Sequence, residues 1–319
     1  MSENTEEIRI LVVCSGNAPD FDFQKHQAFI HDQMNAVSKQ FPEVKFDTFF
    51  VKGKGFKSYL KNFLQLKKQI RKVPYHMIHA HVGHIGFLCG LQRKIPVVVT
   101  FHGSDINHPK TNLISGVACL LAKRVIIVSE KLAKKIVIKR PKITSVIPCG
   151  VDFDLFFPMN KKEARITLHW NEGKKYILFP SAFDISVKNY ALAKKAVSLV
   201  PLGAEIIELK QKTRKEVNLF LNACDLVLLT SFSEGSPQII KEAMACNTPV
   251  VSVDVGDVKE VMDHTEGTFI CHHDEKEIAA NIRLALEFNK KTTGREKIEH
   301  LDNKIIAKRI FEVYKNVVP

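Results

Sequence analysis

Short apolar runs alternate along the whole chain with longer stretches in which apolar and polar residues mix. Residues 8–14 are a run of the first kind, whose length suits a buried strand, and residues 44–51 are predicted to be the next strand. Residues 24 to about 40, between them, have the length and composition of a helix. Strands that alternate with helices predict parallel, doubly wound α/β sheets.

The alternation continues to the end of the chain. Further strands are predicted at residues 77–80, 96–101, 125–128, 145–147, 176–179, 205–209, 226–229, 249–251 and 268–271. Further helices are predicted at residues 52–72, 112–122, from 130, 162–170, 189–199, 213–223, 258–262, 275–288 and about 303–317, with a loop at 290–295. Residues 148–158 contain one glycine and two prolines, which indicates a linker between two domains.

The stretch 226–254 carries the most specific pattern. A strand is followed by a loop, and Ser236 and Pro237 suit the N-cap and the first position of a helix. Asn247 suits a left-handed stop before the next strand. Glu234 lies just before the predicted helix, and Glu242 leans back toward its N-terminus.

Free N–H groups and the helix dipole at residues 235–238 favour a phosphate. A pyrophosphate there, with carboxylates for sugar hydroxyls, describes a nucleotide-sugar site. Spacing alone is explained more simply by a surface helix with two solvated acids.

The identity of the residues in this stretch is more specific than their spacing. Glu234, seven residues, then Glu242-Ala243-Met244-Ala245 and residues 249–251 resemble the signature of glycosyltransferase family 4. The variant at 234–237, with residues 255–258 after it, is most similar to members that make bacterial exopolysaccharide or cell-wall glycans. The resemblance implies the GT-B fold.

This fold consists of two Rossmann-like doubly wound domains that face each other across a cleft. The expected domains are residues 1–152, on the acceptor side, and 153–302, on the donor side. A last helix, about 303–319, is expected to pack back on the first. The second domain is expected to be shortened, because the glycine-rich unit common in the family before the central motif is absent.

The resemblance also assigns residues of the donor site. Lys188 aligns with the lysine that neutralises the departing diphosphate, although the arginine usual about six residues earlier is replaced by Ala182-Phe183. Glu234 would face the donor sugar and Glu242 the ribose. The predicted donor contacts are Gly16, Ser181, Lys188, Glu234, Gly235, Ser236, Pro237, Gln238 and Glu242.

The loop at residues 101–105 resembles the family loop that places a histidine beside the donor sugar. His102 is therefore predicted to be catalytic together with Lys188 and Glu234. Asp105 would position His102 or the acceptor; read without the family, the loop is a turn that Asp105 caps. Asn17, His81 and Asp105 are the predicted acceptor contacts.

Four histidines, at 76, 79, 81 and 84, raise the question of a metal. His79 and His81 alternate along one strand face, yet no nearby cysteine or acid completes a tetrahedral set. They are interpreted as strand-end and loop histidines. No metal and no cofactor are expected, because in this family a helix end and basic side chains bind the diphosphate.

Charge is distributed unevenly along the chain. The whole net charge of +13 falls in residues 1–150, and residues 52–72 carry eight basic residues and no acid. Helical spacing puts residues 56, 59, 60, 63, 64 and 70 on one face and Lys57, Lys61, Lys68 and Lys72 on another. Such a helix favours an anionic membrane surface or an acidic acceptor, or else packs on the core with a solvated lysine face. Nucleic-acid recognition motifs are missing, so no nucleic acid is expected.

Composition points to a cytoplasmic protein. The first residues are polar and acidic, unlike a signal peptide, and no apolar run has the length of a membrane span. Seven cysteines without a CxxC pair indicate reduced thiols.

The resemblance thus implies a cytoplasmic enzyme of retaining hexosyltransferase type, and the basic helix is compatible with a peripheral place at the inner membrane face. It would move a sugar from a nucleotide-diphosphate sugar to a glycan or lipid-linked acceptor in polysaccharide or cell-envelope biosynthesis. The alternatives are a catalytically weak nucleotide-sugar-binding subunit and a nucleotide-sugar epimerase of the same architecture.

Overall fold

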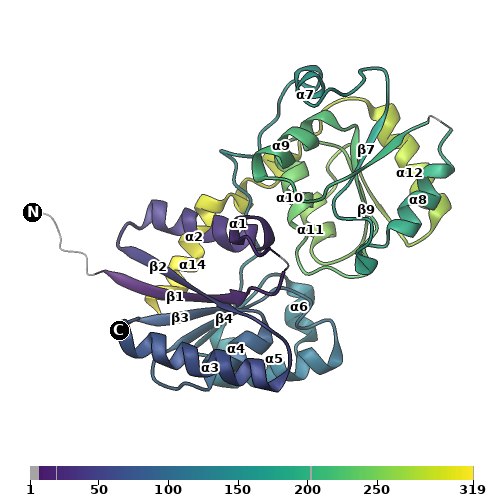
Figure 1. Ribbon diagram of the computed structural model, residues 1–319. Helices are drawn as coiled ribbons and strands as arrows, with labels where there is room; N and C mark the ends of the chain where they lie inside the picture. The colour runs from purple at the N-terminus through teal and green to yellow at the C-terminus, as the bar shows by residue number, and fades with distance from the viewer. Residues whose placement is uncertain (1–6, 19, 202, 319) are drawn as a thin grey trace, which may run out of the picture. The chain divides into compact units, whose positions relative to one another are not determined.

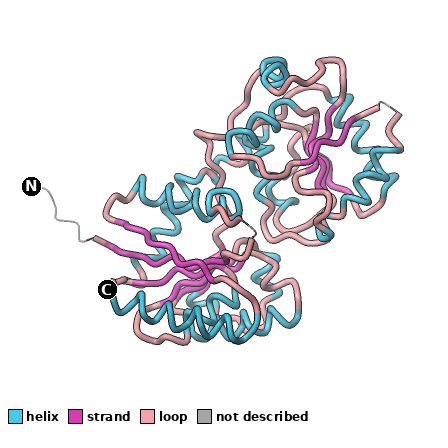
Figure 2. The backbone as a smooth tube through the Cα atoms, viewed as in Figure 1, coloured by secondary structure: helices cyan, strands magenta, loops and turns pink. Residues whose placement is uncertain are grey.

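The computed structural model describes residues 7–18, 20–201 and 203–318. The chain forms two compact units: one comprises residues 1–149 and 303–319, and the other residues 150–302. Each has a central parallel sheet with helices on both of its faces (Figures 1 and 2). The prediction of two parallel α/β domains is confirmed.

The sheet of the first unit has the order β2-β1-β3-β4-β5-β6, with every pair parallel. Its strands are β1 Ile8–Ser15, β2 Val44–Val51, β3 Met77–His81, β4 Val97–Phe101, β5 Arg124–Ile127 and β6 Thr144–Val146. Its helices are α1 Phe23–His26, α2 Ala28–Gln40, α3 Gly55–Lys72, α4 Gly83–Gly90, α5 Pro109–Leu121, α6 Glu130–Lys135 and α14 Asn303–Lys315, with a 3₁₀ turn at Pro141–Ile143.

Strands β3 and β4 are buried at every position, as expected for central parallel strands covered on both faces. One apolar cluster fills the side of the sheet under α3, α4 and α5, and a second fills the side under α2 and α14. Phe311 of α14 stacks on Phe41, with ring centroids 3.8 Å apart. The end of the chain is therefore part of the core of the first unit.

The sheet of the second unit has the order β11-β10-β9-β7-β8, again with parallel pairs. Its strands are β7 Tyr176–Phe179, β8 Glu205–Glu208, β9 Leu226–Leu229, β10 Val250–Val253 and β11 Thr268–Cys271. Its helices are α7 Lys161–Thr167, α8 Tyr190–Ser198, α9 Arg214–Ala223, α10 Gln238–Ala245, α11 Val258–Met262, α12 Glu275–Phe288 and α13 Gly294–Lys297, with 3₁₀ turns at Ser186–Lys188 and Glu299–Leu301.

The expected linker is mostly part of the second unit. Val151 is bridged to Asp302, and Phe156 is fully buried in the core of that unit. The chain passes from one unit to the other at Cys149–Gly150, slightly before the boundary expected at 152–153. The apolar residues of the stretch decide this, since they anchor it to a core despite its glycine and prolines.

Three local expectations are wrong. The helix expected at 24–40 is broken at Gln27, whose φ of −132° and ψ of 39° are not helical, so that it separates α1 from α2. Ser236 is not a helix N-cap: Pro237 holds that position without a side-chain cap. The loop expected at 290–295 already contains the start of α13.

The apolar residues of α3 do not form one face. Tyr59, Phe63 and Ile70 pack against the core, and Leu66 is fully buried there. A second set of apolar side chains is exposed beside the lysines. It comprises Phe56, Leu60 and Leu64, with exposed fractions of 83%, 47% and 58%. They lie about one quarter-turn from the core-facing set, so a single apolar face was the wrong interpretation.

All seven cysteines are described and are free thiols. Within residues 7–18, 20–201 and 203–318, no helix combines the length and apolar character needed to cross a membrane.

Candidate functional site

The predicted motif lies at the carboxyl end of β9 in the second unit. Asn247 has a φ of 56° after α10, so the predicted left-handed stop is confirmed. Glu234 lies in the loop between β9 and α10, and its side chain is 15% exposed. The loops at this end of a parallel sheet are where ligands of doubly wound folds bind.

Lys188, in the 3₁₀ turn that follows β7, is held next to this loop by contacts with the residues that follow β9. The hydroxyl of Thr230, after β9, donates to the carbonyl oxygens of Lys188 and Asn189. The backbone N–H of Phe232 donates to Val187. Asn189 has a left-handed φ of 54° and starts the next helix. These contacts bring Nζ of Lys188 to 2.6 Å from Oε1 of Glu234.

Glu234 is fixed by a second donor. The hydroxyl of Ser231 donates to the same Oε1 over 2.7 Å. The carboxylate thus has a defined position between a hydroxyl and an ammonium. The sequence predicted the residues Lys188 and Glu234 but not their direct contact.

Glu242 on α10 is almost completely buried, and Arg214 covers it. Nη1 of Arg214 lies 2.6 Å from Oε1 of Glu242, and the guanidinium also stacks over the ring of Phe156. Sequence reasoning missed Arg214. One signal was present: Arg214 is the first residue of α9, where the helix dipole disfavours a cation, so its charge has another role.

A network of buried polar side chains supports the loop from behind. The hydroxyl of Ser236 donates to Oδ2 of Asp257 over 2.6 Å, and Lys241 lies 3.2 Å from the same oxygen. Lys241 also donates to the Ser236 hydroxyl. Ser236, predicted as a cap, is instead tied to Asp257 because that carboxylate is the stronger acceptor.

Gly256 makes this support possible. Its φ is +59°, and a Cβ there would lie 2.6 Å from the carbonyl oxygen of Gly235 and 3.2 Å from Cδ of Pro237. The loop of Gly256 and the loop of Gly235 are therefore in contact through their backbones.

Two further predicted donor contacts lie in this unit. Gln238 donates to the carbonyl oxygen of Gly150 over 2.5 Å. Ser181 is buried just after β7.

The remaining predicted residues lie in the first unit. Nε2 of His102 is 2.9 Å from Nδ1 of His81, and the two rings are stacked. His79 is held by the hydroxyls of Tyr314 and Thr100, each at 2.7 Å. Burial lowers the pKa of His79 and of His102 to about 3 and lowers that of His81 as well, so all three are neutral near pH 7.

Asp105 is buried and accepts backbone N–H groups from Gly83, His102 and Gly103. Burial raises its pKa to about 6, against the lowering effect of these hydrogen bonds. The carboxylate holds the loop that carries His102. Positioning of His102 is thus the role that its contacts support, and its acceptor contact stays a prediction, as does that of the buried His81.

Gly16 and Asn17 follow β1. A Cβ on Gly16 would lie 2.9 Å from Cβ of Phe50, and Oδ1 of Asn17 accepts the N–H of Gly53 over 2.6 Å. Their ligand contacts stay predictions. Among the described residues, no group of three or more His, Cys, Asp or Glu side chains is arranged to hold a metal ion.

Two protein-family models match the chain, one in each unit. Residues 6–155 match the model of Glycosyltransferase Family 4, and residues 200–299 match that of Glycosyl transferases group 1. The chain belongs to the glycosyltransferases that these models describe, as the motif predicts.

Curated relatives carry glycosyltransferase names. The D-inositol 3-phosphate glycosyltransferase of Mycobacterium marinum (strain ATCC BAA-535 / M) is 25% identical over 268 residues, which are 69% of this chain and 57% of that protein. The N,N'-diacetylbacillosaminyl-diphospho-undecaprenol alpha-1,3-N-acetylgalactosaminyltransferase of Campylobacter jejuni subsp. jejuni serotype O:2 is 26% identical over 308 residues, 81% of this chain and 82% of that protein. The chain spans little more than half the length of the mycobacterial relatives.

Solved structures share the fold. Sucrose-phosphate synthase from Thermosynechococcus elongatus has a TM-score of 0.80 at 16% identity, covering 97% of this chain and 98% of that one. Anabaena HepE in complex with UDP-glucose has a TM-score of 0.76 at 16% identity, covering 97% and 100%. The expected GT-B fold class is confirmed.

Proposed function

We propose that the protein is a retaining glycosyltransferase that moves a hexosyl group from a nucleotide-diphosphate sugar to a glycan or lipid-linked acceptor. The contact between Lys188 and Glu234 at the carboxyl end of β9 carries this proposal. A donor site needs a cation to bind the diphosphate and a carboxylate to accept hydrogen bonds from the sugar hydroxyls. Lys188 and Glu234 provide these two groups side by side. The HepE complexes with UDP and UDP-glucose make uridine nucleotides the first donors to examine.

Lys188 neutralises the charge that develops on the departing diphosphate. Its ammonium has three donors, so it can keep Glu234 as a partner while it binds a phosphate oxygen. Glu234 orients the sugar through its hydroxyls. Helix α10 begins at Gln238, and the free N–H groups and positive dipole end at this N-terminus favour a bound phosphate.

Glu242 binds the ribose, and Arg214 supplies the second cation of the donor site. It takes the place of the arginine that the family usually has near Ala182. Because Arg214 covers Glu242, ribose binding requires the guanidinium to rotate toward the nucleotide. In that position it would pair with a phosphate or with the base.

Transfer with retention proceeds by attack of the acceptor hydroxyl on the face that the diphosphate leaves. The bond from the anomeric carbon to the phosphate oxygen breaks as the bond to the acceptor oxygen forms. The acceptor proton passes to the departing phosphate oxygen. His102, neutral because burial lowers its pKa, donates a hydrogen bond to a sugar hydroxyl.

The protein acts at an anionic membrane surface, to which α3 binds. Lys57, Lys61 and Lys68 share a shallow groove with Leu60 and Leu64. Exposed apolar side chains beside lysines suit insertion at the headgroup level with the ammonium groups on anionic lipid. A lipid-linked acceptor would be presented at the same surface.

Thermal stabilisation by a panel of nucleotide diphosphates and their sugars tests the donor. The single tryptophan, Trp170, packs on Tyr176 and Phe220 in the second unit and reports on it. A bound donor raises the melting temperature as its concentration exceeds Kd. Glu242→Ala and Glu234→Gln should each remove the shift. Full transfer activity in Glu234→Gln would contradict the site assignment.

A further inference from the structure

A cavity of about 330 Å³ lies in the second unit at the amino end of its sheet. Asp225 and Pro249 line it, and these residues immediately precede β9 and β10. The loop with Glu234 follows β9 and therefore lies at the opposite, carboxyl end of the strands of the same parallel sheet. The cavity is separate from the candidate donor site.

We propose that this cavity is a second ligand site, which binds a phosphate-bearing anion. Cavities of this size hold small ligands. Three lysines line it, Lys161, Lys290 and Lys291, against the one carboxylate of Asp225. Asn160, Asn222 and Thr248 also line it, but the Asn222 amide and the Thr248 hydroxyl donate to other groups of the protein, so the lysines are the donors for an anion.

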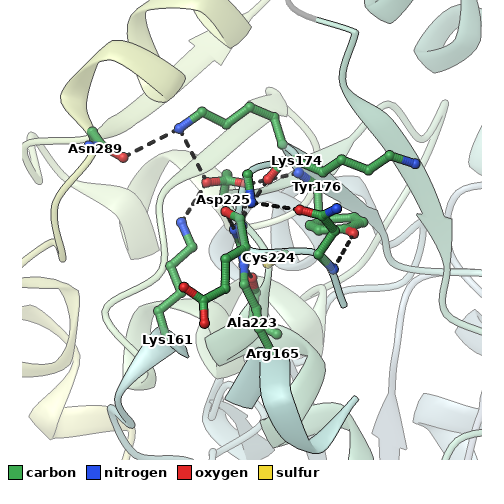
Figure 3. A network of polar contacts seen from close by, with 12 residues as sticks. Lys161, Arg165, Lys174, Tyr176, Ala223, Cys224, Asp225 and Asn289 are labelled. Atoms are coloured by element: carbon green, nitrogen blue, oxygen red, sulfur yellow. Dashed lines mark hydrogen bonds and ion pairs between the residues drawn. The ribbon is translucent and has the colours of Figure 1, made fainter. Parts of the chain in front are cut away.

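Asp225 does not neutralise the cations around it (Figure 3). Its Oδ1 lies 2.5 Å from Nζ of Lys161 and 3.7 Å from Nζ of Lys175. Its Oδ2 accepts from Nη2 of Arg165 and from the N–H of Tyr176. One buried carboxylate thus pairs with three cations, Lys161, Lys175 and Arg165, so the charge of this group is net positive.

Lys291 adds a cation whose hydrogen-bond partners are neutral. Its ammonium donates to Oδ1 of Asn222 over 2.8 Å and to the carbonyl oxygen of Cys246 over 3.1 Å. No carboxylate pairs with it in the part of the chain that the structure describes. Burial lowers the pKa of this lysine. Lys291 as a residue is exposed at the cavity, so its ammonium can reach an anion there, and that anion would supply the counter-charge that its neutral partners do not.

Lys290 lies at the exposed rim. Its ammonium is 3.3 Å from Glu266, and both side chains are mostly in solvent, so the pair is weak. It is free to turn toward an entering anion. The site therefore has one cation that two hydrogen bonds hold in place, Lys291, and a second, Lys290, that can turn toward the ligand.

Isothermal titration of the full chain with inorganic phosphate and with glycerol 3-phosphate, at low ionic strength, tests the proposal. Lys290→Gln/Lys291→Gln should weaken binding at least tenfold, about 1.4 kcal/mol. Lys290→Glu, at an exposed position that folding does not need, should weaken it as well. Lys194→Gln, an exposed lysine on α8, and Lys188→Gln at the donor site should leave it within about twofold. Tighter binding of glycerol 3-phosphate would identify a phosphate monoester as the ligand, and equal binding would identify the free ion.

Three results would overturn the proposal: no binding of either probe, unchanged binding in both Lys290 variants, or binding lost in Lys188→Gln alone. The last would place the anion at the donor site. Trp170 fluorescence melting without ligand establishes that each variant is folded. The outcome is independent of the proposed transfer reaction, because the assay contains no nucleotide sugar.

Discussion

Nη1 of Arg214 lies 2.6 Å from Oε1 of Glu242, and Glu242 has almost no contact with solvent. A carboxylate at the predicted ribose position thus has a guanidinium as its partner. Arg214 comes from α9 and Glu242 from α10, two helices whose first residues follow different strands. The contact bears on both the stability of the second unit and its ligand binding.

Arg214→Gln should destabilise the second unit by about 3–5 kcal/mol, because it leaves a buried carboxylate without its cation. Adding Glu242→Gln should recover much of the loss. Urea unfolding followed by Trp170 fluorescence measures both. Lys215→Gln, the exposed neighbour on α9, is the matched control and should have an effect within about 0.5 kcal/mol. Equal stability of Arg214→Gln and wild type would show that the pair contributes nothing.

Lys188→Ala should lower the turnover of the donor sugar by about 10²-fold or more, since it removes a charge aimed at the leaving group. Lys188→Arg should retain part of the activity. The measurement is release of nucleotide diphosphate at saturating donor and acceptor. Lys195→Ala, an exposed lysine on α8, should act like wild type. A turnover in Lys188→Ala equal to that of the control would remove this lysine from the mechanism.

Gly256→Ala should weaken donor binding and lower the stability of the second unit. Gly203→Ala provides the control, because both glycines have a φ of +59° but a Cβ on Gly203 has open space. The backbone strain, about 1–2 kcal/mol, is common to both variants. Only Gly256→Ala pushes on the carbonyl oxygen of Gly235. The difference between the two in melting temperature and donor Kd measures the loop contact, and no difference would show that the loop moves without cost.

Acid should destabilise the first unit through His79. The unfolded chain binds a proton on this residue near pH 6.5, and the folded protein only near pH 3, because burial lowers the pKa. The unfolded state therefore binds more protons between these values. Stability is full above pH 6.5 and falls on acidification by about 1.4 kcal/mol per pH unit for this group.

His79→Gln should reduce that slope, as measured by hydrogen exchange of the β3 amides between pH 6.5 and 4. A slope identical to wild type would mean that His79 is protonated in the folded protein. His26→Gln, at an exposed position outside the core, should keep the wild-type slope.

Binding to vesicles should depend on the exposed stripe of α3, which consists of Leu60 and Leu64 with Lys57, Lys61 and Lys68. Leu60→Ser/Leu64→Ser should weaken co-sedimentation with vesicles that contain phosphatidylglycerol. Lys57→Gln/Lys61→Gln/Lys68→Gln should weaken it further at low salt, because screening reduces the attraction at higher ionic strength. The same change at the exposed Lys134, Lys135 and Lys139 is the charge-matched control. Binding that ignores the stripe and follows net charge alone would contradict a docking role for α3.

The sequence determined where the strands are and which residues share an element. The bounds of β2, β7, β9 and β11 agree with the strands predicted at 44–51, 176–179, 226–229 and 268–271. Strands β7 and β9 are buried at every position, and strands covered on both faces must be continuously apolar, which makes them recognisable in the sequence. Asn247 was predictable for a local reason as well, since few residues tolerate a left-handed backbone.

Only the tertiary structure decided what each side chain meets. Periodicity shows which residues share a face but not what covers it, so the exposure of Phe56 and Leu60 and the burial of Glu242 were not predictable. Parallel crossovers bring together residues far apart in sequence. Lys188 therefore reaches Glu234, and Lys161 reaches Asp225, through the strand order of the sheet rather than through any local pattern.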